Sequence, residues 1–92
     1  MERKHRTRLG ILLEVLETIN SLGEASITEI ITHANIPHNR LKKILDGLVR
    51  KKYVAERTKN RRKLFALTPK GFELMRQLEH LKRIIEGLGL NI

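Results

Sequence analysis

Residues 36–54 read IPHNRLKKILDGLVRKKYV, and this stretch predicts one amphipathic helix. Its apolar residues recur at the three- and four-residue spacing of a single helical stripe, namely Leu41, Ile44, Leu45 and Leu48. The opposite side of the same helix carries Asn39, Lys43 and Arg50, flanked by Arg40, Lys42 and Gly47, with Asp46 as its one acid. One face is therefore suited to packing, and the other to a polyanion.

A shorter helix is predicted just before this one. Ser26 and Glu29 have the spacing of a capping box, which would open a helix over Ile27–Ala34. Pro37 disfavours helical geometry at the residue before it, and Asn35 is a candidate for the left-handed conformation that such a break needs. A helix, a three-residue break and a second helix are the signature of a helix-turn-helix.

The flanking segments complete a small mixed domain. Apolar periodicity predicts a helix over Leu9–Leu22 that stops at Gly23, followed by a short strand or extended link. Tyr53–Arg57 and Lys63–Leu67 are predicted strands, joined by the polar connection 58–62. Their expected inward-facing side chains are Val54, Phe65 and Leu67. A hairpin directly after the second helix of a helix-turn-helix would be a wing.

The last helix is expected to mediate dimerisation. Thr68 and Pro69 suit the first positions of a helix, and apolar residues then alternate in steps of three and four over about 69–88. This seam consists of Gly71, Leu74, Leu78, Leu81, Ile85 and Leu88, of which all but Gly71 form the predicted interface. The alternative is a helix folded back on its own domain. Phe72, Met75 and Ile84 lie off the seam and fit either arrangement.

The positive charge is concentrated in one part of the chain. The 92 residues carry a net charge of +9. Residues 38–63 contain eleven Lys or Arg against two acids, whereas residues 9–37 contain no Lys or Arg and four glutamates. Such segregation predicts one basic surface for nucleic acid, with a merely solubilising charge run as the alternative. The segment 1–8 adds a short basic arm that is either a frayed terminus or a phosphate-binding arm.

The sequence lacks the residues that several other functional classes require. The absence of cysteine excludes disulfides, thiolate metal sites and cysteine nucleophiles. His5, His33, His38 and His80 lack metal-binding spacing, and no glycine-rich phosphate loop is present. We therefore expect no enzyme activity, no metal and no cofactor. No apolar run reaches the ~20 residues of a membrane span, so we expect a cytoplasmic, nucleoid-associated protein without membrane contact.

Two segments resemble winged-helix regulators of the MarR and PadR kind. The first runs from Ile36 through Leu41 and on to Arg50-Lys51-Lys52-Tyr53-Val54, and resembles their recognition helix. The second, Leu64-Phe65-Ala66-Leu67-Thr68-Pro69-Lys70-Gly71, resembles the Y-x-L-T-x-x-G segment that leads into their final helix. In size the chain is most similar to small archaeal winged-helix proteins, a group that includes predicted regulators and chromatin components.

The resemblance implies a homodimer with one recognition helix per subunit in a major groove of double-stranded DNA. Carried over by position from the family, the residues that would contact DNA are, on the helix, His38, Asn39, Arg40, Lys42, Lys43 and Arg50, and, on the wing, Lys59, Arg61 and Arg62. Pro37 stands where the family usually has a serine or threonine cap. The chain is also too short for the extra helices of the larger MarR proteins, so no small-molecule effector is evident.

The sequence thus predicts a single mainly α domain with a small β-hairpin (α+β), a winged helix-turn-helix over 9–68 with a dimerisation helix over 69–88. Three functions compete: a transcription regulator with a specific operator, an architectural chromatin protein with little sequence preference, and a winged helix that binds protein or RNA. Asn39 and Arg40 are the expected base readers, because Asn pairs well with adenine edges and Arg with guanine. The remaining cations would contact phosphates.

Overall fold

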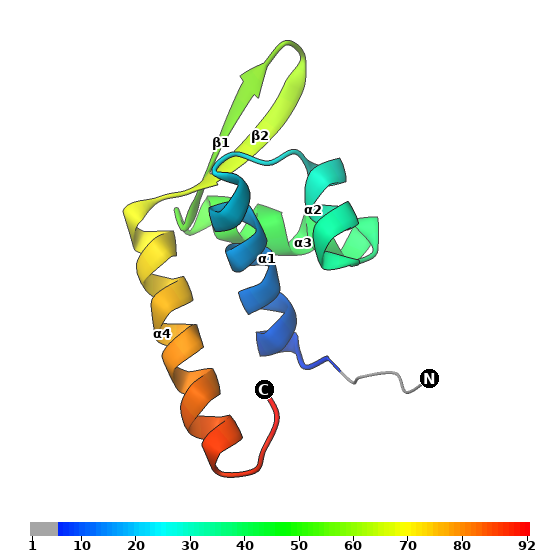
Figure 1. Cartoon of the computed structure of the whole chain (residues 1–92). Helices are drawn as coiled ribbons and strands as arrows, with labels where there is room; N and C mark the ends of the chain where they lie inside the picture. The colour runs from blue at the N-terminus through cyan, green and yellow to red at the C-terminus, as the bar shows by residue number, and fades with distance from the viewer. Residues whose placement is uncertain (1–5) are drawn as a thin grey trace.

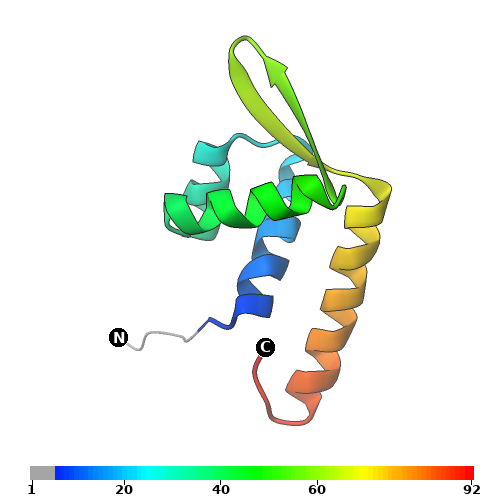
Figure 2. The same cartoon turned by 180° about the vertical axis from the view of Figure 1, so that it is seen from behind.

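The computed structural model describes residues 6–92, which form four helices and one antiparallel hairpin (Figure 1). In chain order the elements are α1 (Arg8–Leu22), α2 (Ile27–Ala34), α3 (His38–Arg50), β1 (Val54–Lys59), β2 (Arg62–Leu67) and α4 (Pro69–Gly87). Seen from behind, α3 lies across α1, and the hairpin projects from the corner where α3 ends and α4 begins (Figure 2). From that corner, α4 runs back alongside α1. The expected α+β winged helix-turn-helix is confirmed.

The core is aliphatic, as the scarcity of aromatic residues predicts. Leu13, Leu16 and Ile19 of α1 are fully buried together with Leu41 and Leu45 of α3. Among the three aromatic residues, Phe65 is buried at the hairpin, whereas Phe72 on α4 is exposed. The stripe on α3 therefore does pack inward, which leaves its opposite face free.

Local capping sets the ends of the helices. The Ser26–Glu29 capping box is present, Asn35 adopts the left-handed conformation at φ 54°, and the Thr68 hydroxyl accepts a hydrogen bond from the Gly71 amide. These three predictions are confirmed. The first helix begins one residue earlier than expected, because Thr7 caps it by accepting from the Gly10 amide.

The wing differs from the prediction in its turn. Its strands reach Lys59 and Arg62, so the connection is the two residues Asn60 and Arg61 and not five. Both have positive φ, 51° and 64°, as the tight type I′ hairpin turn requires. Ala25 also pairs with Phe65 through two backbone hydrogen bonds of 2.9 and 2.8 Å, so the link before α2 is a short edge of the sheet.

The start of α4 lies against residues 51–53, the segment that follows α3. A Cβ atom on Gly71 would lie 1.9 Å from the carbonyl oxygen of Tyr53. Gly71 is therefore an approach point between two backbones, and its expected place in a dimerisation seam is corrected. The Thr68 hydroxyl donates to the Lys52 oxygen at 2.7 Å, and Lys70 Nζ donates to the Lys51 oxygen at 3.0 Å.

A pair of carboxyl groups lies between α1 and α4 and makes stability depend on pH. Partial burial first, and then a hydrogen bond and repulsion from Glu79, raise the pKa of Glu17 above its ordinary 4.5, against the attraction of Lys82. The folded chain therefore holds this proton more tightly than the unfolded chain. Stability contributed by the proton is present at acid pH and is lost as pH rises through the raised pKa.

We expect Glu17→Gln to raise the free energy of unfolding at pH 7, by less than about 1 kcal/mol because solvent screens a group this exposed. The gain should disappear below about pH 4, where the wild-type carboxyl is protonated as well. Urea unfolding at both pH values measures this effect. Glu73→Gln, an exposed change on α4, is the control and should alter stability little. A gain that persists at pH 3 would contradict the ionisation argument.

Candidate nucleic-acid interface

The outer face of α3 is a cationic surface. All six residues expected to meet DNA on this helix are exposed: His38, Asn39, Arg40, Lys42, Lys43 and Arg50. Helical geometry stacks Asn39, Lys43 and Arg50 along the line opposite the buried stripe. Arg40 and Gly47 lie to one side of that line and Lys42 to the other. Five of the nine predicted contact residues thus share one face of one rigid element, and His38 is exposed at the first position of the same helix.

The wing tip carries a second group of cations. Lys59, Arg61 and Arg62 lie at or beside the turn and are exposed. Cations nearer the base of the hairpin have partners in the chain: Arg57 pairs with Glu24, and Lys63 Nζ lies 3.7 Å from Glu56. The pairing with Arg57 lowers the pKa of the Glu24 carboxyl. The structure thus leaves the predicted wing residues exposed at the tip of the hairpin.

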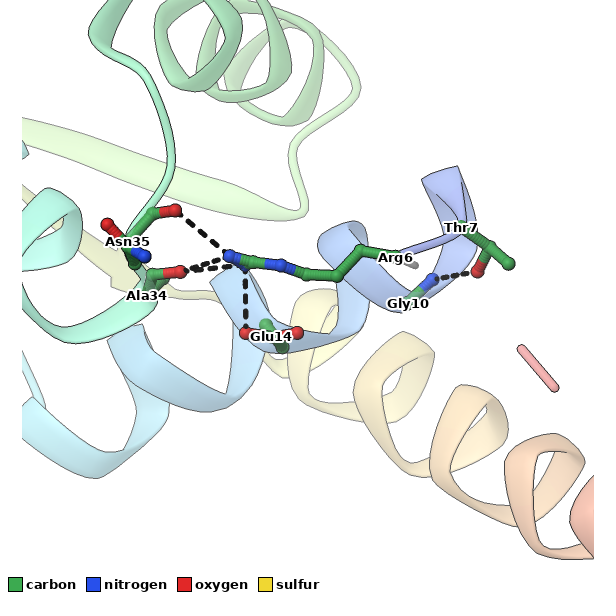
Figure 3. Close-up of polar contacts among 6 residues, drawn as sticks. All are labelled: Arg6, Thr7, Gly10, Glu14, Ala34 and Asn35. Carbon is green, nitrogen blue, oxygen red and sulfur yellow. Dashed lines mark hydrogen bonds and ion pairs between the residues drawn. The ribbon is translucent and has the colours of Figure 1, made fainter. Parts of the chain in front are cut away.

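Both ends of α3 are fixed by residues outside the helix. At its C-terminal end, Thr68 and Lys70 bond the carbonyl groups that follow the helix. At its N-terminal end, Pro37 supplies no side-chain cap, and the preceding turn is bonded by Arg6 (Figure 3). None of these residues was predicted to act on α3, because each reaches it from a distant part of the sequence.

The basic arm is corrected in part. Arg6 does not project outward as an arm residue would, since its guanidinium is turned onto Ala34 and Asn35 (Figure 3). Arg8 is the first residue of α1. Arg3 and Lys4 lie outside the described residues. Within the described residues 6–8, Arg6 therefore does not act as part of a phosphate-binding arm.

A groove of about 960 Å³ lies beside α3, between α1 and α4. Its apolar surface comes from all three helices and includes Ile11, Ile44 and Leu74. Five cations and no acid line it: Arg8, Arg40, Lys43, Arg50 and Lys51. The sequence did not predict this groove, because it depends on how α4 sits against the other helices.

The predicted dimer residues fall into two groups. Leu78 is buried in the core of its own chain, and Leu74 and Ile85 are half-buried. Leu81 and Leu88 are exposed, with 38% and 71% of their surface accessible, and Ile84, expected off the seam, is 49% accessible. The apolar stripe left accessible on α4 and its C-cap therefore consists of exposed Leu81, Ile84 and Leu88, together with half-buried Leu74, which also lines the groove. It keeps three residues of the predicted seam and contains Ile84 in place of Leu78 and Ile85.

Comparison with known proteins agrees with this geometry. The structure of Sso10a-2, a DNA-binding protein from Sulfolobus solfataricus, is similar over 90% of this chain and 85% of that one, with 31% identity and a TM-score of 0.82. AF1382 from Archaeoglobus fulgidus is similar over 82% and 87%, with 32% identity and a TM-score of 0.70.

The oxidized form of MarR from E. coli is similar at 25% identity and a TM-score of 0.71, over 78% of this chain. The match spans 53% of MarR, about half its length. Among curated proteins, none matches the sequence.

The sequence itself also matches a family. Residues 5–86, from before α1 almost to the end of α4, match the model of the winged helix-turn-helix family. That range contains the helix-turn-helix, the wing and all of the α4 stripe except Leu88. The chain therefore belongs to the winged helix-turn-helix family.

Proposed function

We propose that this chain is a homodimeric transcription regulator that binds double-stranded DNA, with α3 in the major groove and the wing tip on the backbone. The observation that carries the proposal is the unbroken exposure of the predicted cations on α3, a helix fixed at both ends. A rigid cationic helix beside a cationic hairpin tip suits a helix-turn-helix docking on a duplex. We propose a binding role for this chain and no catalytic one.

Dimerisation is part of the same proposal. The α4 stripe of half-buried Leu74 and exposed Leu81, Ile84 and Leu88 repeats in steps of seven, three and four residues, the spacing of a coiled-coil seam. In water such a stripe favours burial against a second copy. Two copies joined through α4 would present two α3 helices to one duplex.

An architectural role with little sequence preference is the second candidate. It is supported by the net charge of +9 on 92 residues, because binding without sequence preference depends on contacts between cations and phosphates. The two candidates differ in discrimination, since a regulator must bind its operator far more tightly than random DNA.

Two single substitutions separate base reading from phosphate binding. We expect Arg40→Ala to reduce preference for a selected site, whereas Arg61→Gly should weaken binding to every sequence and lower the salt slope by about one. Glycine suits the positive φ of Arg61, so the hairpin turn is kept while the charge is lost.

The experiment selects duplexes from a random pool and compares selected with random DNA at two salt concentrations. A preference of about 1,000-fold or more would support a regulator. Tight, salt-sensitive binding to all sequences would support the architectural role instead. Equal loss on both DNAs for Arg40→Ala would contradict its role in base reading, and no binding at low salt would overturn the DNA proposal.

A further inference from the structure

Arg6 crosses from the segment before α1 to the turn of the helix-turn-helix (Figure 3). Its two terminal nitrogens donate to the Ala34 oxygen at 2.8 and 2.7 Å, and one of them also donates to the Asn35 oxygen at 2.9 Å. Glu14 of α1 holds the same guanidinium at 3.3 Å. One side chain therefore connects α1 to the end of α2.

The turn it reaches determines how α3 lies. The last carbonyl groups of a helix have no partners within that helix, and Ala34 is the last residue of α2. Asn35 follows with a left-handed backbone, and residues 35–37 are the whole connection to α3. Because Pro37 gives α3 no side-chain cap, the bonds from Arg6 are the side-chain contacts to this turn among the described residues.

Lysine could not replace these contacts. The planar guanidinium directs several N–H groups at once, whereas an ammonium is a single point charge on a flexible stem. Here one guanidinium bonds two successive carbonyl groups and a carboxylate together. The geometry uses the shape of arginine as well as its charge.

We propose that Arg6 is a positioning residue for α3, which sharpens sequence discrimination without touching DNA. The proposal rests on the proposed DNA-binding function. Removing the bonds lets the turn at Asn35 relax, so Asn39 and Arg40 lose their fixed direction toward base edges. Phosphate contacts from the wing and from the middle of α3 tolerate such a change better than bidentate base contacts do.

The test compares Arg6→Lys and Arg6→Ala with Arg8→Lys, the same conservative change at an exposed residue two positions later. Binding to selected and random duplex is measured at a temperature where urea unfolding shows every variant to be folded. We expect both Arg6 variants to lose about tenfold in the ratio of the two affinities, with the salt slope unchanged. Arg8→Lys should keep the wild-type ratio.

Two outcomes would overturn the proposal. Wild-type discrimination in Arg6→Lys would show that charge alone suffices, and an equal loss on both DNAs with a slope lower by about one in Arg6→Ala would show a phosphate contact. If Arg6→Ala does not fold, Glu14→Gln loosens the guanidinium without removing it and should lower the same ratio by a smaller factor.

A wild type that binds no DNA would end the proposed function and with it the discrimination claim. Amide hydrogen exchange tests the positioning role of Arg6 without DNA, so it distinguishes a failure of the DNA-binding proposal from a failure of that role. If amide exchange in α3, measured relative to α4, is faster in Arg6→Lys than in the wild type, Arg6 positions α3 in the wild type even though no DNA is bound. Unchanged exchange would show that it does not.

Discussion

Replacing Gly71 with alanine is expected to destabilise the fold by about 3 kcal/mol, the upper part of the range for forced overpacking. The added methyl would lie 1.9 Å from the Tyr53 oxygen and 2.9 Å from the Tyr53 carbonyl carbon. Both atoms are backbone and cannot rotate away, so α4 must shift and strain the bonds of Thr68 to Lys52 and Tyr53. Urea unfolding measures the loss.

Gly47→Ala is the matched control, because it too adds one methyl to a helical glycine. At Gly47 the new Cβ would meet only the end of the Arg50 side chain, at 4.0 Å. Alanine should therefore stabilise α3 by about 0.5–1 kcal/mol, the usual gain over glycine inside a helix. An unfolding free energy for Gly71→Ala equal to that of the wild type would contradict the close approach.

The segment around Gly71 couples the proposed dimer helix to α3. Thr68 caps α4 and also bonds the carbonyl groups after α3, and Gly71 lets the two backbones meet. The resemblance of Leu64–Gly71 to the family's Y-x-L-T-x-x-G segment thus has a physical reason in this chain. Any movement of α4 against a second copy would reach α3 through these contacts.

Local chemistry explains what the sequence could predict. The Ser26–Glu29 box, the left-handed Asn35 and the Thr68 cap each depend on residues within four positions of one another. The stripe on α3 likewise follows from helical periodicity, and with it the exposed basic face. The fold class and the predicted contact residues on α3 rested on these short-range signals.

Longer-range geometry explains what the sequence did not predict. No local pattern shows that Arg6 reaches Asn35 or that Gly71 faces Tyr53, since these pairs meet only after the helices pack. The predicted connection of the wing was too long because the tight turn places Arg61 at positive φ, where glycine is the residue usually found. On α4 the buried and exposed stripes are adjacent, so apolar spacing alone could not assign Leu78 and Ile84 to the right one.

Replacing both Lys43 and Arg50 with glutamine should produce the largest loss of DNA binding. The two residues lie on the line opposite the buried stripe of α3 and are exposed. If each residue neutralises one phosphate, the slope of the logarithm of affinity against the logarithm of salt concentration should become less steep by about two for each bound subunit. At 0.1 M salt this corresponds to an affinity about 60-fold weaker per subunit. Titration of a fluorescent duplex over a range of salt concentrations measures both quantities.

The matched control is Arg76→Gln with Arg83→Gln, which removes the same charge from exposed positions on α4. A long-range effect of net charge would weaken binding similarly in both double variants, because it does not depend on where the cations lie. A direct contact on α3 would change the salt slope only in the Lys43 and Arg50 variant. Equal slopes in the two would therefore contradict the placement of α3 on DNA, even if both variants bound less tightly than the wild type.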